Sequence, residues 1–212
     1  DPSHPAMPAY LGRLYRSLRR CGFGYFKIDF LLWAPLALAQ GGRPANPRVT
    51  LLEAIRAALR SIRTAIGPKS VLLGCGGFFP EIGAGLYDAC RASVDISSYW
   101  SNILTIARDM AVKSLFAGKV WQNDYDFLIV RSAATACERR LNVYRDLNTF
   151  VAFKPYRPFV LRSGPAISSE NEVRAWASLI LVSGGSLVLA DRLRLLNARG
   201  RRILDVVLRY SD

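Results

Sequence analysis

Short, continuously apolar runs alternate with longer amphipathic segments along this chain, and this alternation limits the fold more than any other feature of the sequence. Strand-like runs occupy residues 25–30, 70–74, 92–96, 127–130 and 187–190, and helical segments occupy 8–20, 50–66, 100–116 and 170–182, with a last helix opening at Asp191. Strands alternating with helices of about 10 to 15 residues indicate βα units and a parallel sheet. Because the runs are apolar at successive positions, the sequence predicts an α/β protein whose strands are buried on both faces.

Two architectures accommodate five such βα units: an open doubly wound sheet and most of a (β/α)₈ TIM barrel. No Gly-x-Gly-x-x-Gly stands between a strand and a helix, which argues against a dinucleotide site. The barrel is favoured because polar residues follow the carboxyl ends of strands, where barrels place their chemistry, at Asp29, Cys75, Asp95, Arg131 and Asp191. A closed barrel requires eight strands and about 250 residues, so these 212 residues predict a partial barrel.

Charge and rare side chains argue against several classes of function. The formal net charge is +13, but the arginines are spread along the helical segments. That spread predicts solvated helix faces and leaves nucleic-acid binding as the less favoured alternative. One histidine, His4, and four cysteines without Cys-x-x-Cys spacing provide neither a zinc site nor a disulfide scaffold. The longest apolar stretch, 30–39, contains Pro35 and is shorter than the roughly 18 residues of a membrane span.

We therefore expect no metal, no cofactor, no nucleic-acid partner and no membrane partner. Acid–base chemistry then falls to carboxylates, tyrosine, lysine or cysteine. The cysteines and the lack of a visible signal peptide predict a cytoplasmic location. The chain begins with Asp1 rather than Met, which is typical of a processed chain or a fragment.

Two carboxylates stand at predicted strand ends beside basic residues. Lys27 and Asp29 are two apart, so in a strand they point to one side, where the cation favours the ionised form that a nucleophile needs. A structural ion pair on an edge strand fits the same spacing. Arg91, Ser93 and Asp95 repeat the pattern on the next strand but one, and a buried salt bridge is again the alternative. Two carboxylates on one rim are what glycoside hydrolysis requires.

Conspicuous motifs follow one another over nearly the whole chain: Asp-Pro-Ser-His-Pro at 1–5, Tyr-Phe-Lys-Ile-Asp-Phe at 25–30, Leu-Leu-Gly-Cys-Gly at 72–76, Arg-Ala-Ser-Val-Asp at 91–95, Trp-Gln-Asn-Asp-Tyr-Asp at 121–126, and Ser-Gly-Gly at 183–185 followed by Asp191. In this order they resemble glycoside hydrolase clan D, the melibiase-like α-galactosidases of family 36 and the related family 27. Two departures stand out. Tyr125 replaces a proline of the family pattern, and Arg192 follows Asp191 where a second aspartate is usual.

The resemblance implies a retaining mechanism. Asp29 would be the nucleophile that attacks the anomeric carbon, and Asp95 the acid/base that protonates the leaving oxygen and then activates water, with the carboxyl groups about 5–5.5 Å apart. Lys27, Arg91 and Cys75 would bind the sugar, and Trp100 would either stack on it or pack in the core. Asn123, Asp124, Asp126 and Asp191 would brace the rim rather than touch the sugar. No cofactor is implied.

The resemblance also implies that the chain is the C-terminal part of a catalytic barrel, with strands about four to eight in a single catalytic-domain fragment over 1–212. The absent N-terminal half would carry the residues that select the sugar, and strand 25–30 would be left as a sheet edge. Residues 133–167 form an insertion before the last strand, as an extra helix, a lid or a contact in a homo-oligomer. An α-galactosidase acting on oligosaccharides or other glycosides is therefore expected. The alternatives are a transglycosylase and an inactive carbohydrate-binding relative.

Overall fold

The computed structural model describes residues 1–30, 37, 40–76, 80–137 and 166–211. They form a mixed α/β structure with a parallel sheet, as the sequence predicts. The chain divides into two compact units, one made of Asp1–Arg91 with Gly118–Gln122 and the other of Ala92–Ala117 with Asn123–Asp212. Most of the predicted insertion, 138–165, lies outside the described residues. No helix in the described part of the chain combines the length and hydrophobicity needed to cross a bilayer.

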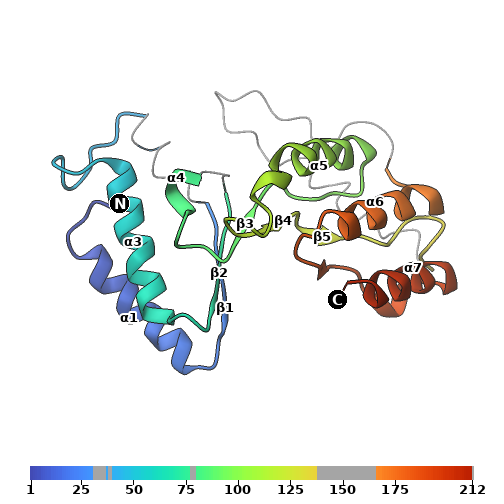
Figure 1. Ribbon diagram of the computed structural model, residues 1–212, viewed down its shortest axis with the longest axis horizontal. Helices are drawn as coiled ribbons and strands as arrows, with labels where there is room; N and C mark the ends of the chain where they lie inside the picture. The colour runs from blue at the N-terminus through green and yellow to red at the C-terminus, as the bar shows by residue number, and fades with distance from the viewer. Residues whose placement is uncertain (31–36, 38–39, 77–79, 138–165, 212) are drawn as a thin grey trace. The chain divides into compact units, whose positions relative to one another are not determined.

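The first unit contains α1 (Met7–Arg20), β1 (Tyr25–Ile28), α3 (Leu51–Ile66), β2 (Val71–Gly74), α4 (Pro80–Gly83) and β3 (Ala89–Arg91). The strands are ordered β1-β2-β3-β4, so that β1 lies at one edge of this sheet (Figure 1). β1 and β2 are parallel, as are β2 and β3. The backbone N–H of Gln122, which opens β4 (Gln122–Asp124), donates to the Asp88 carbonyl at 2.8 Å.

Helices α1 and α3 lie side by side in the first unit (Figure 1). A capping box starts α3, because the Thr50 hydroxyl accepts the Glu53 N–H while the Glu53 carboxylate accepts the Thr50 N–H. The helix buries an apolar stripe and ends at Gly67, whose φ of 75° suits glycine. From α1, the Tyr15 ring packs 5.7 Å from the ring of Phe26 in β1. Helical periodicity in 8–20 and 50–66 therefore predicted both helices correctly.

Two arginines of α3 bind other segments of the first unit instead of only facing solvent. Arg56 donates from Nη1 to the carbonyls of Glu81 and Ile82, both at 2.9 Å. Arg63 donates to the carbonyls of Leu86 and Ser70 and pairs with Asp88. Only part of the basic charge is therefore a solvated helix face, which corrects the expectation from sequence.

The second unit contains α5 (Trp100–Lys113), a 3₁₀ turn (Ser114–Phe116), β5 (Phe127–Leu128), α6 (Glu170–Val182), β6 (Val188–Leu189), a second 3₁₀ turn (Leu193–Leu195) and α7 (Ala198–Arg209). β5 and β6 pair in parallel as a separate two-stranded sheet. Trp176 of α6 and Ile106 of α5 are fully buried in this unit.

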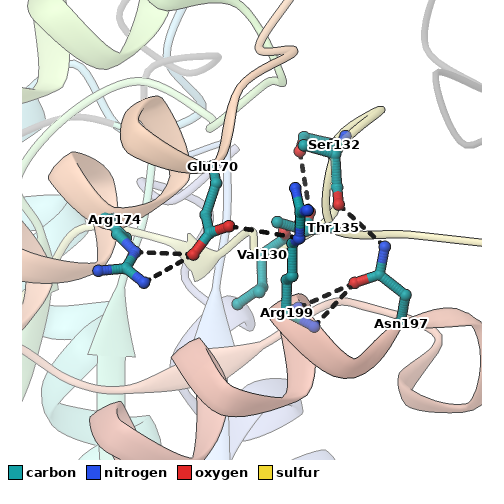
Figure 2. A network of polar contacts seen from close by, with 9 residues as sticks. Val130, Ser132, Thr135, Glu170, Arg174, Asn197 and Arg199 are labelled. Atoms are coloured by element: carbon teal, nitrogen blue, oxygen red, sulfur yellow. Dashed lines mark hydrogen bonds and ion pairs between the residues drawn. The ribbon is translucent and has the colours of Figure 1, made fainter.

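Polar contacts join the turn after β5 to the start of α7 (Figure 2). Asn197 caps α7 by accepting the N–H groups of Arg199 and Gly200, and its Nδ2 donates to the Ala134 carbonyl at 2.9 Å. In the same turn the Thr135 hydroxyl donates to the Val130 carbonyl. These contacts fix residues 130–135 against a helix more than sixty positions further along the chain.

The third strand is shifted from its predicted place. The prediction of 92–96 is wrong, because β3 is Ala89–Arg91 and residues 92–96 form no strand. Cys90 pairs with Gly74 in the ladder, and the Ala92 N–H still donates to the Asp124 carbonyl at 2.8 Å. Further along, the Ile96 N–H donates to the Asp126 carboxylate instead of to a neighbouring strand. Arg91 and Asp95 consequently do not share a strand face.

Other boundaries differ for similar reasons. Strands 127–130 and 187–190 shorten to two residues each, and β4 was not predicted. The Val130 N–H donates to the Asp191 carboxylate at 2.5 Å, so it does not extend the pairing of β5 with β6. Since that carboxylate is engaged there, Asp191 does not open the last helix, which starts at Ala198 under the Asn197 cap.

Candidate active site

Strand register brings three predicted site residues together in the first unit. Ile28 pairs with Gly74, and Gly74 pairs with Cys90. The next residue along each strand is Asp29, Cys75 and Arg91, so the three lie on adjacent parallel strands at their carboxyl ends. The Cys75 N–H donates to the Ile28 carbonyl at 2.7 Å, so the pairing of β1 with β2 reaches Cys75.

Asp29 follows β1 and has an accessible carboxylate. Its Oδ2 lies 3.9 Å from Lys27 Nζ, and the two side chains are 40% and 39% exposed. Its Oδ1 accepts the Phe30 N–H at 2.7 Å, in a turn where Phe30 takes a φ of 56°. An ion pair this exposed contributes at most about 1 kcal/mol to stability. The Lys27–Asp29 pair therefore orients a reachable carboxylate more than it stabilises the sheet.

Cys75 is buried next to Asp29. The pKa of its thiol is raised to about 11, chiefly by burial and also by a hydrogen bond to Asp29, while the charges of Arg91 and Lys27 act to lower it. The thiol is therefore protonated at neutral pH and donates to the carboxylate rather than competing with it as a nucleophile. Arg91 is also buried, with 5% of its surface exposed.

Asp95 lies in the second unit on residues 92–99, here called the Asp95 loop, and it is exposed. The loop backbone is held from two sides. Asn102 of α5 donates from Nδ2 to the Asp95 carbonyl at 3.0 Å and accepts the Ser97 N–H at 2.6 Å, and Asp126 accepts the Ile96 N–H at 2.8 Å. Nearer β3, the Ser93 hydroxyl donates to Asp109 at 2.6 Å.

The predicted rim residues around β4 are buried and hydrogen-bonded within the second unit. Asn123 donates from Nδ2 to the Lys113 carbonyl and to the Tyr125 hydroxyl, both at 2.9 Å. Asp124 accepts the N–H of Asp126, whose φ of 72° turns the chain there. The Tyr125 ring occupies the space beside Gly185, where a Cβ would lie 2.7 Å from it. Tyr125 thus packs where the family pattern has proline.

Asp191 and Arg131 form an ion pair inside the second unit. Arg131 Nη1 lies 2.7 Å from Asp191 Oδ1, and the side chains are only 9% and 3% exposed. With Oδ2 bound to the Val130 N–H, both carboxylate oxygens of Asp191 have partners in the protein. Trp100, the first residue of α5, is partly exposed.

The predicted site residues thus divide between the units. Lys27, Asp29, Cys75 and Arg91 lie together in the first, whereas the second contains Asp95, Trp100, Asn123, Asp124, Asp126 and Asp191. The separation of the Asp29 and Asp95 carboxyl groups remains a prediction. Sequence reasoning missed Asn102, although an available signal was an asparagine on the same helix face as the buried Ile106 and Met110.

A cavity of about 650 Å³ in the first unit is a separate feature. Its lining is largely apolar and comes from α1, α3, the end of β1 and the segments around residues 1–3 and 42–49, with Leu11, Ile28 and Leu59 among the lining residues. Asp29, Cys75 and Arg91 are not part of its wall. A sugar site needs several converging polar groups, so we place the candidate active site at the strand ends.

Comparison with known structures bears on the fold. No protein-family model matches the sequence. TtGalA, an alpha-galactosidase from Thermus thermophilus solved with p-nitrophenyl alpha-D-galactopyranoside, is similar with a TM-score of 0.63 and 20% identity over 100% of this chain and 38% of its own. Its complex with stachyose gives 0.61 and 20% over 98% and 39%. A GH27 β-L-arabinopyranosidase from Geobacillus stearothermophilus, Abp, gives 0.63 and 15% over 98% and 42%.

The chain shares a fold with part of these glycosidases. It spans about two fifths of their length. At identities of 20% or less the likeness concerns the fold alone, and it agrees with the predicted α/β class.

Proposed function

We propose that this chain is the C-terminal part of a (β/α)₈ catalytic barrel in a retaining α-glycosidase that hydrolyses terminal α-galactosides of oligosaccharides. The observation that carries the proposal is the register of Asp29, Cys75 and Arg91 on three adjacent strand ends. That edge is where barrels of this kind place their chemistry. The motif resemblance to clan D and the fold shared with the galactosidase and arabinopyranosidase point the same way.

In the first step Asp29 attacks the anomeric carbon and forms a covalent glycosyl-enzyme. The Phe30 N–H and Lys27 hold its two oxygens, and the neutral Cys75 thiol donates to the same carboxylate without supplying a rival nucleophile. Arg91 and Lys27 are the nearby cations that would hydrogen-bond sugar hydroxyls. The Asp29 carboxylate is exposed enough for a sugar to reach it.

Asp95 donates a proton to the leaving oxygen and then removes one from the attacking water. Its exposure on a loop with a fixed backbone suits a group that must meet first a leaving group and then a water molecule. Asn123, Asp124, Asp126 and Asp191 act as braces, since each has hydrogen-bonding partners within the protein. An N-terminal barrel half, supplied by sequence outside this chain, completes the site.

Proton NMR of the reaction with p-nitrophenyl α-galactoside tests this proposal. The assay uses the full protein, meaning the complete product of the gene that encodes this chain. Retention predicts that α-galactose appears first and that its β anomer grows in later by mutarotation. Initial formation of β-galactose would show inversion and contradict the mechanism.

The same samples separate the alternatives. Galactose binding without hydrolysis would identify an inactive carbohydrate-binding relative. Transfer of galactose to an added sugar, in preference to water, would identify a transglycosylase that uses the same intermediate.

A further inference from the structure

The backbone around Asp95 is clamped at three consecutive residues by two buried side chains. Asn102 contacts the Asp95 carbonyl and the Ser97 N–H, and between them Asp126 accepts the Ile96 N–H. Asn102 is 0% exposed and Asp126 is 4% exposed, whereas Asp95 is exposed. The loop backbone is therefore held by buried side chains, while Asp95 itself is exposed.

Asparagine suits this position because one side chain must both donate and accept. The Asp95 carbonyl needs a donor and the Ser97 N–H needs an acceptor, and the two ends of one amide satisfy both at 3.0 and 2.6 Å. Aspartate retains an acceptor but loses the donor, and alanine loses both. A buried polar group left without its partner is destabilising, so the conformation of this loop is sensitive to this one residue.

We propose that Asn102 is a positioning residue that holds Asp95 in place as the general acid. This inference rests on the proposed function, because it presumes that Asp95 is the acid. A general acid contributes roughly 10²- to 10⁴-fold to rate only when it lies within hydrogen-bonding reach of the leaving oxygen. A misplacement of about 1 Å can cost roughly 10²-fold. Holding the backbone from the Asp95 carbonyl to the Ser97 N–H limits that displacement.

The test compares two leaving groups in the full protein carrying Asn102→Asp or Asn102→Ala. The measured quantity is kcat/KM, which covers the steps up to the glycosyl-enzyme. Methyl α-galactoside needs protonation of its leaving oxygen, whereas 2,4-dinitrophenyl α-galactoside releases a stable anion. We expect kcat/KM for the methyl glycoside to fall about 100-fold, and that for the dinitrophenyl glycoside to fall less than about threefold because its departure needs no acid.

Thr105→Ala is the matched control, since Thr105 lies on the same helix and its hydroxyl donates to the Ser101 carbonyl within that helix. This variant should leave kcat/KM for both substrates unchanged.

Amide hydrogen exchange adds a readout that is independent of turnover. The Ser97 N–H should exchange faster in Asn102→Ala and stay protected in Asn102→Asp, which keeps the acceptor.

Equal losses for the two substrates, or unchanged protection of Ser97 in Asn102→Ala, would overturn the positioning role while leaving the proposed function intact. A wild-type protein that hydrolyses neither glycoside would instead overturn the proposed function, and this inference with it. Should Asn102→Ala fail to fold, the substrate ratio in Asn102→Asp decides alone.

Discussion

Replacing Asp29 with alanine should lower kcat for p-nitrophenyl α-galactoside by about 10⁴-fold or more, the scale seen when a nucleophile is removed from a catalytic unit. The full protein should still fold, because the Asp29 side chain is 40% exposed and its contact with Lys27 is a weak surface ion pair. Steady-state release of p-nitrophenol measures the loss. Turnover at the wild-type rate would remove Asp29 from the mechanism.

Added azide gives the same variant a second, stereochemical readout. With the carboxylate gone, azide can enter from the face that Asp29 occupied and displace the leaving group directly, so the expected product is β-galactosyl azide. Asp95→Ala is the matched control. There azide intercepts the glycosyl-enzyme, and two successive displacements give α-galactosyl azide. The same azide anomer from both variants would contradict the assigned roles.

Replacing Arg131 with methionine should lower the free energy of unfolding by about 3–5 kcal/mol, because it leaves a buried carboxylate without its ion-pair partner. That carboxylate belongs to Asp191, whose side chain is 3% exposed and pairs with Arg131 at 2.7 Å. Methionine preserves much of the side-chain volume, so the loss reports on charge. Urea unfolding of the full protein, followed by circular dichroism, measures it.

Arg174→Met is the matched control for Arg131→Met. Arg174 pairs with Glu170 at a similar distance of 2.6 Å, but its side chain is 61% exposed. Its removal should cost about 0.5 kcal/mol. Adding Asp191→Leu to Arg131→Met should recover part of the loss, since the unpaired buried charge is then removed. A loss below about 1 kcal/mol for Arg131→Met would show that Asp191 finds another partner or reaches solvent.

Local signals in the sequence were sufficient for the helices and for most of the parallel strands. The apolar runs near Tyr25 and Val71 are strands, and the polar residue after each one lies at the carboxyl end of the sheet, as Asp29 and Cys75 do. The α3 capping box and its apolar stripe lie within one segment, so that sequence pattern alone predicts the helix.

Features that depend on distant partners could not be predicted in this way. The strand predicted at 92–96 does not form, because the Ile96 N–H donates to the Asp126 side chain instead of to a neighbouring strand. Asp191 does not cap a helix because Val130 and Arg131 already bind its carboxylate. Each contact joins residues far apart in sequence, and neither leaves a mark in hydrophobic periodicity.

The candidate site likewise contains residues that the sequence predicted and a supporting residue that it did not. Asp29 and Cys75 were found from their places at predicted strand ends and from motif resemblance, and Arg91 from its spacing to Asp95 and the same resemblance. The support beneath Asp95 was not, because Asn102 acts through backbone groups of a loop that has no regular pattern. The useful signal was a polar side chain on an otherwise apolar helix face.

Mass spectrometry of the full protein treated with a fluorinated galactosyl fluoride, whose glycosyl-enzyme hydrolyses slowly, tests the central claim most directly. We predict one glycosyl adduct per molecule, located on Asp29 by peptide fragmentation. In Asp95→Ala the adduct should form much more slowly only from substrates whose leaving group needs an acid. An adduct on a different carboxylate, or none from a protein that turns over galactosides, would contradict it.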